Sequence, residues 1–141
     1  GEDGYQASRI DSFLDADLVF AREAQVYLLG IDKISEEGYQ RMSAAYEFYL
    51  SGIEATLSDN EYLAGNSLTI ADISFVCDFA QFLREGHYEE QLAGQGLSLI
   101  SQGGQEEYPR AYDHMLELNT RPEFSEVMGS YLSWYRRKLE G

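Results

Sequence analysis

The fold is decided by residues 62–73, which read Tyr62-Leu63-Ala64-Gly65-Asn66-Ser67-Leu68-Thr69-Ile70-Ala71-Asp72-Ile73. Thr69 and Asp72 have the spacing of a helix capping box, in which each side chain accepts a hydrogen bond from a backbone N–H near the other residue. Leu68 and Ile73 have the spacing of a hydrophobic staple, which fixes the angle at which the chain enters a helix. We therefore predict a helix that begins after Thr69, and we interpret Asp72 as a buried structural cap and not as a catalytic acid.

The helix predicted after this cap, over residues 69–83, is apolar almost all round. Its polar edge consists of Ser74, Asp78 and Gln81. A helix with this pattern usually lies in the middle of a bundle. Cys77, the single cysteine of the chain, lies on this helix and is predicted to be a buried, unreactive thiol.

The flanking sequence also has helical periodicity, over residues 8–30 and 35–57. The first segment has one apolar face, made of Ile10, Phe13, Leu14, Leu18, Ala21, Ala24 and Leu28, and a second stripe, made of Phe13, Phe20 and Tyr27. The second segment has a single face, made of Tyr39, Met42, Tyr46, Tyr49, Leu50, Ile53 and Leu57. Because strand alternation of useful length is absent from the sequence, we predict an all-α bundle of five to six helices that forms one domain over residues 1–141.

Residues 86–107 interrupt the helical pattern, since they contain five glycines. We predict a short helix near residues 88–92, followed by a mobile connector that is either a lid over a pocket or a solvent-exposed loop. Helical pattern resumes with Pro109 and again after Pro122. The last helix is expected to direct Phe124, Val127, Met128, Tyr131 and Tyr135 inward.

Composition excludes several functions. The 141 residues include 25 acidic and 10 basic side chains, a net charge of −15, which disfavours binding to nucleic-acid phosphates or to anionic membrane surfaces. The chain lacks an apolar run near the ~18–20 residues of a membrane-spanning helix, and its single cysteine fits a reducing, cytoplasmic setting. His87 and His114 have no second His or Cys at ligand spacing, so we expect no metal site; Asp113 and His114 are interpreted as a surface pair.

The pattern Tyr-Leu-Ala-Gly-x-x-Leu-Thr-x-Ala-Asp-Ile, followed by an apolar helix, resembles the capping box and staple of the glutathione S-transferase C-terminal domain. Residues 8–14 are similar to the start of that domain's first long helix. Residues 108–124 are similar to its later helices, where an Arg-Pro pair, here Arg121-Pro122, opens another helix. The resemblance covers essentially the whole chain except residues 86–107, and it implies an all-helical domain.

Members of this family usually carry an N-terminal thioredoxin-like domain that binds glutathione and activates its thiol. We expect this chain to contain no thioredoxin-like domain, because the residues that follow Gly1 are helical in pattern and Pro109 and Pro122, its only prolines, provide no cis-proline strand motif. The resemblance therefore implies a chain that has no catalytic residues or cofactor of its own. We expect it to be inactive alone, although the complete protein would use glutathione as a co-substrate.

In this family, the first helix of the domain lines the pocket for a hydrophobic electrophile. The resemblance thus implies Phe13, Asp17 and Phe20 as substrate-binding residues, and an acidic residue on this helix can meet the glutathione amine of the partner subunit in a homodimer. Asp17 can also be a solvated residue at the edge of the apolar stripe. The alternative function is a non-catalytic protein-interaction module, as in translation-associated assemblies, with the two-sided first helix as its interface.

Overall fold

The computed structural model describes residues 2–124, 135, 137 and 138, and residues 2–118 form six α-helices and two 3₁₀ helices. In chain order these are α1 (Glu2–Leu29), η1 (Ile31–Lys33), α2 (Glu36–Asp59), α3 (Ile70–Phe82), η2 (Leu83–Tyr88), α4 (Glu89–Gly94), α5 (Gly104–Glu107) and α6 (Pro109–Leu118). Within the described residues, β structure is limited to an isolated bridge between Tyr62 and Gly65. The predicted all-α bundle of five to six helices is therefore confirmed.

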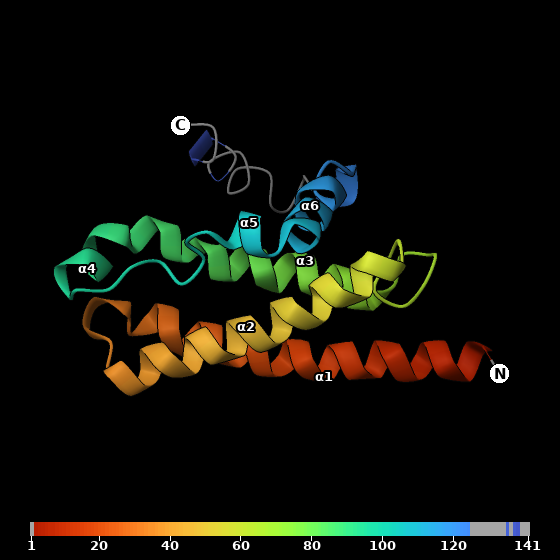
Figure 1. The fold of residues 1–141 in the computed structure, drawn as a ribbon, viewed down its shortest axis with the longest axis horizontal. Helices are drawn as coiled ribbons and strands as arrows, with labels where there is room; N and C mark the ends of the chain where they lie inside the picture. Colours follow the sequence, from red (N-terminus) through yellow and green to blue (C-terminus); the bar gives the residue numbers. More distant parts are fainter. Residues whose placement is uncertain (1, 125–134, 136, 139–141) are drawn as a thin grey trace.

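Four helices surround the core. α1 packs against α2 and α3, and α6 also packs against both α2 and α3. Figure 1 shows α1 along one long side of the molecule, α2 crossing it, and α5 and α6 on the opposite side. The space between them is filled by fully buried apolar side chains, among them Phe20, Leu50, Ile53, Phe75, Phe79 and Met115.

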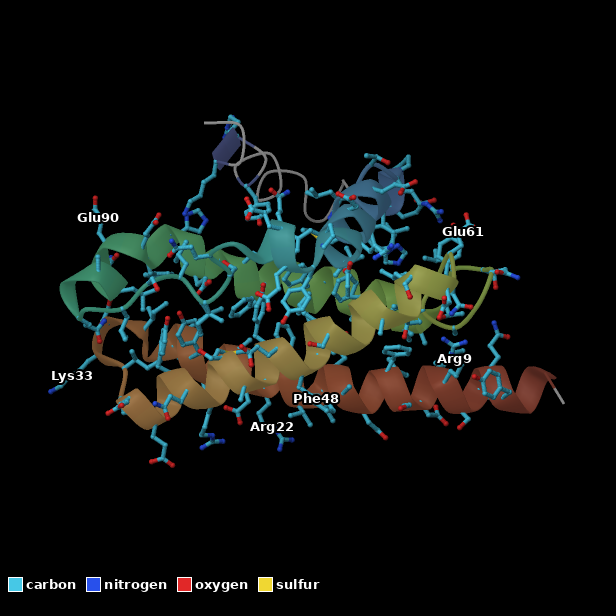
Figure 2. The ribbon with its side chains drawn as sticks, viewed as in Figure 1. Arg9, Arg22, Lys33, Phe48, Glu61 and Glu90 are labelled. Carbon is cyan, nitrogen blue, oxygen red and sulfur yellow. The ribbon has the colours of Figure 1, made fainter. Side chains whose placement is uncertain are left out.

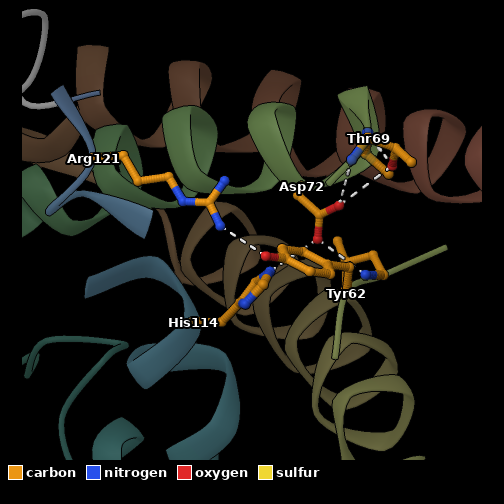
Figure 3. A network of polar contacts seen from close by, with 7 residues as sticks. Tyr62, Thr69, Asp72, His114 and Arg121 are labelled. Carbon is orange, nitrogen blue, oxygen red and sulfur yellow. Dashed lines mark hydrogen bonds and ion pairs between the residues drawn. The ribbon is translucent and has the colours of Figure 1, made fainter. Parts of the chain in front are cut away.

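The start of α3 has the predicted capping-box geometry (Figure 3). The backbone N–H of Thr69 donates to Asp72 Oδ2 over 3.0 Å, and the Thr69 hydroxyl accepts from the N–H of Ala71 over 3.3 Å. Asp72 Oδ1 accepts from the N–H of Leu63 over 3.0 Å and lies 2.9 Å from Nε2 of His114. The prediction that His114 is a surface residue is wrong, because α6 directs it inward onto this carboxylate.

The sequence pattern of α1 predicts only part of the face that this helix buries. Phe20, Ala24 and Tyr27 are buried, whereas Leu18 is 62% exposed. Each predicted stripe therefore meets the core in part, since Phe20 and Tyr27 belong to the stripe with a spacing of seven and Ala24 belongs to the other face. In the described chain, only α2 and α3 pack extensively on α1, so the side that carries Leu18 faces solvent.

α3 is central but is not covered all round as its sequence predicted. Phe75, Val76 and Phe79 are buried, while Ile70, Ile73 and Cys77 are exposed. The expectation that Cys77 is buried is wrong, because this edge of α3 lies outside its contacts with α1 and α6. The helix thus has an apolar strip that no described part of the chain covers.

Residues 86–107 have more regular structure than predicted. The short helix near residues 88–92 is present as α4, but the following segment also contains α5 and is tied to the core by the buried Glu85. One oxygen of Glu85 accepts from the Tyr27 hydroxyl over 2.6 Å and from the N–H of Ile100 over 3.2 Å. The other accepts from the N–H and the hydroxyl of Ser101 over 2.8 and 2.7 Å. The hydrogen bonds of this buried carboxylate thus add to the packing of Leu97, Leu99 and Ile100 against the core.

The helix predicted after Pro122 is described only in part. Phe124 and Tyr135 are buried, as expected; Val127, Met128 and Tyr131 lie outside the described residues. The helices of the described chain include none that is both long enough and apolar enough to span a membrane.

Candidate functional site

A cleft with a volume of about 650 Å³ lies between α1 and α2. Its lining is largely apolar and includes Phe13 and Ala16 from α1 and Ala44, Phe48 and Tyr49 from α2. The aromatic side chains are Phe13, which is half-buried, Phe48, which is 77% exposed, and Tyr49, which is buried. A concave apolar site of this size can hold a small hydrophobic molecule.

Phe48 lies at the rim of this cleft. Figure 2 shows it near the point where α2 crosses α1. Leu18, Val19, Val26 and Leu29 of α1 are also large apolar side chains with most of their surface exposed. Exposed apolar residues in such number typically indicate a ligand- or protein-binding surface.

The structure places the three predicted substrate-binding residues differently. Phe13 lines the cleft. Phe20 has no exposed surface, and its ring centroid lies 4.9 Å from that of Tyr49 and 5.5 Å from that of Phe82. Phe20 therefore contributes to the core beneath the cleft and not to its lining.

Asp17 is a buried polar residue behind the cleft, with 7% of its surface exposed. Its Oδ1 accepts a hydrogen bond of 3.0 Å from the hydroxyl of Tyr49, and its carboxyl also hydrogen-bonds to that of Asp78 on α3. Burial, together with the neighbouring Asp78 carboxyl, raises the pKa of Asp17 to about 8. The alternative of a solvated Asp17 is wrong, because α2 and α3 cover this position.

A protonated Asp17 limits the chemistry of this region at neutral pH. Because its pKa is raised to about 8, Asp17 behaves at neutral pH as a neutral hydrogen-bonding group and not as an anion. Tyr49 connects it to the cleft, since this residue lines the cleft while its hydroxyl binds Asp17. The arrangement suits binding of an apolar molecule and contains no activated nucleophile.

Cys77 does not add a reactive thiol to this region, and the described histidines do not add a metal site. Burial and the carboxyls of Asp78 and Asp17 raise the pKa of the Cys77 thiol, so the reactive thiolate is scarce at neutral pH. In the described part of the chain, His, Cys, Asp and Glu side chains form no group of three or more that could hold a metal ion.

Sequence reasoning missed two buried polar groups, His114 and Glu85. His114 lies three residues after Ala111 and four before Leu118, both of which are buried, so it shares the inward face of α6. That spacing could have predicted that His114 is buried. Glu85 gives no comparable signal, because its partners Tyr27, Ile100 and Ser101 come from distant parts of the chain.

The comparison with known protein families gives one match. Residues 10–122 match the family described as "Glutathione S-transferase, C-terminal domain". This range contains the last 20 of the 28 residues of α1, together with α2, the α3 cap and α6. Searches of curated proteins and of solved structures gave no match.

Proposed function

Because the chain belongs to the family of glutathione S-transferase C-terminal domains, we propose that it is the substrate-side domain of a glutathione S-transferase-like protein. The complete protein would conjugate glutathione to hydrophobic electrophiles. In that reaction the glutathione thiolate attacks the electrophile, and a thioredoxin-like domain binds glutathione and activates its thiol. The helical domain contributes the hydrophobic pocket and part of a homodimer interface, in a cytoplasmic protein.

The apolar cleft between α1 and α2 is the observation that carries this proposal. Phe13 and Phe48 offer aromatic surface for a planar, apolar electrophile. Tyr49 has its hydroxyl engaged by Asp17, so the cleft presents its ring and not a free polar group. The cleft therefore binds by burial of apolar surface, and its preference is for hydrophobicity more than for a particular polar pattern.

Binding of a hydrophobic electrophile tests the cleft directly. The neutral dye Nile red is titrated into the purified chain and displaced with 1-chloro-2,4-dinitrobenzene. We expect Phe48→Ala to weaken dye binding about fivefold, because it removes aromatic surface from the rim. Val26→Ala is the matched control, since Val26 is a comparably exposed apolar residue of α1 that does not line the cleft. Equal effects of the two substitutions would contradict a specific site.

An activity assay tests whether the helical domain has transferase activity without the thioredoxin-like domain. The purified chain is incubated with glutathione and 1-chloro-2,4-dinitrobenzene, with a complete glutathione transferase as the positive control. We expect no turnover above the uncatalysed rate, because the residues that would activate the thiol are assigned to the thioredoxin-like domain. Robust turnover would refute the claim that this domain only supplies the substrate side.

Exposed apolar residues outside the cleft favour a second candidate function, a non-catalytic protein-interaction module. Leu18 and Val19 of α1 and the α3 strip of Ile70, Ile73 and Cys77 are exposed in the described chain. Size-exclusion chromatography with light scattering, followed by a pull-down, separates the two functions. A specific heteromeric partner supports the module, whereas a homodimer that binds the electrophile supports the transferase domain.

A further inference from the structure

A buried hydrogen bond joins the two helices that form the walls of the apolar cleft. The Tyr49 hydroxyl of α2 donates to Asp17 Oδ1 of α1 over 3.0 Å, and the two residues are 3% and 7% exposed. Tyr49 is also a lining residue of the cleft. So are Phe13 and Ala16, which lie on α1 within the four residues before Asp17. The Asp17 carboxyl is therefore close to any molecule that occupies the cleft.

The groups that face Asp17 from the two helices packed on α1 include no cation. From α2 the facing group is the Tyr49 hydroxyl, and from α3 the Asp78 carboxyl hydrogen-bonds to Asp17. Burial and the carboxyls of Asp78 and Asp17 raise the pKa of the Cys77 thiol, which places that thiol near both acids. Within the described part of the chain, neither Asp17 nor Asp78 forms an ion pair with Lys, Arg or His. A negative charge on Asp17 would thus lie beside a second carboxyl with no cation to offset it.

Ionisation of Asp17 and occupation of the cleft have opposite requirements for water. Burial and the Asp78 carboxyl raise the pKa of Asp17 to about 8, so the side chain is neutral at neutral pH and ionises in mildly alkaline solution. A buried anion is costly, and access to water reduces that cost. An apolar molecule in the cleft excludes water from the wall that includes Tyr49 and Ala16. The bound molecule and the Asp17 proton should therefore favour each other.

We propose that binding of a neutral apolar molecule in the cleft is coupled to protonation of Asp17, so that Asp17 sets the pH range in which the cleft binds. This inference rests on the proposed function of the cleft as a hydrophobic pocket. The coupling is reciprocal, because the protonated chain binds the molecule more tightly and the occupied chain holds the proton more tightly. Affinity is greatest near neutral pH and falls as the pH rises through the range in which Asp17 ionises.

Fluorescence titration with Nile red, which is neutral and does not titrate in this range, tests the coupling. We expect the wild type to bind about three- to tenfold more weakly at about pH 9.5 than at about pH 6.5, at constant ionic strength. The change is modest because Asp17 is already largely buried without a ligand. Asp17→Asn carries a neutral side chain at every pH, so its affinity for the dye should stay constant over the same range.

Asp15→Asn is the matched control for the removal of one acid from α1. Asp15 is exposed, lies two residues before Asp17, and does not line the cleft. The substitution changes the net charge equally and should leave the pH dependence of the wild type intact. Circular dichroism at each pH confirms that the three proteins are folded across the titrated range.

The outcomes separate the coupling from the cleft itself. A fall in affinity with rising pH in the wild type and in Asp15→Asn, but not in Asp17→Asn, supports the coupling. Saturable binding of constant affinity in the wild type, or an equal fall in Asp17→Asn, would overturn the coupling and leave the hydrophobic pocket as proposed. Absence of saturable binding at the lower pH would overturn the pocket and the coupling together.

Discussion

Asp72 and Asp17 are both buried aspartates in a helical protein, yet their surroundings shift their pKa values in opposite directions. Burial alone raises the pKa of Asp72, but hydrogen bonds from His114, Leu63 and Thr69 outweigh burial and hold it below its usual value. Burial also raises the pKa of Asp17, and the Asp78 carboxyl raises it further, to about 8. One carboxyl is a stable anion, and the other keeps its proton at neutral pH.

Position along the helix explains the contrast. Asp72 lies in the first turn of α3, where backbone N–H groups are free to donate and the helix dipole favours negative charge. Asp17 lies in the middle of α1, where the backbone N–H groups are already used within the helix. Its partners are therefore side chains of other helices, a phenol and a second acid. A buried carboxyl at a helix start stabilises the fold, whereas one in a helix interior destabilises it.

Removal of the Asp72 carboxylate should have the largest effect. Asp72→Ala leaves the N–H groups of Leu63 and Thr69 and the ring of His114 without their partner. We expect the free energy of unfolding to fall by about 3–5 kcal/mol, measured by urea denaturation at neutral pH. Asp78→Ala is the matched control on the same helix, and it should cost much less because it relieves the crowding of Asp17. Equal losses of unfolding free energy in Asp72→Ala and Asp78→Ala would contradict a stabilising role that is specific to Asp72.

Asp17→Asn should act in the opposite direction and depend on pH. Folded Asp17 keeps its proton up to about pH 8, whereas an unfolded aspartate loses it near pH 4. The folded state therefore binds more protons between these values, and the wild type loses stability as pH rises from about 4 to about 8. We expect Asp17→Asn to gain stability relative to wild type as the pH rises from about 4 to about 8, by up to about 5 kcal/mol at about 1.4 kcal/mol for each pKa unit, and to lose that advantage near pH 4. A pH-independent difference would contradict the raised pKa.

Acid unfolding should reveal the opposite sign for Asp72. Because its pKa is lowered on folding, its contribution is present above the ordinary value near pH 4 and is lost as the pH falls through the folded value. We expect the stability advantage of wild type over Asp72→Asn to shrink below about pH 4, by about 1.4 kcal/mol for each pKa unit of lowering. Urea denaturation of both proteins at neutral and acidic pH measures this change.

The Thr69 hydroxyl should contribute least. Thr69→Ala removes one N-cap acceptor but leaves Asp72 on the backbone N–H of residue 69. We expect a loss of about 1 kcal/mol, with Thr69→Ser nearly neutral because serine retains the hydroxyl. Thermal or urea unfolding checks both variants. A loss as large as that of Asp72→Ala would mean that the hydroxyl and not the carboxylate organises the helix start.

The same contrast explains which parts of the molecule could be predicted from the sequence. The α3 cap was predictable because Thr69, Asp72 and the N–H groups they bind lie close together in the chain. Periodicity also marked Asp17 as a polar residue on an apolar stripe, but not its partners, which come from α2 and α3. The position of the segment after α4 gave no sequence signal, since it depends on hydrogen bonds from Ile100 and Ser101 to the buried Glu85.

The helices, the start of α3 and the family could all be read from the amino-acid sequence, because they depend on side chains within a few residues of one another. Tertiary packing was needed to establish which side chains of α1 are buried, that Cys77 and Leu18 face solvent, and that Asp17 retains a proton. Periodicity defines the faces of a helix but not what covers them. Burial, and the pKa shifts that depend on it, are determined by neighbouring helices from distant parts of the chain.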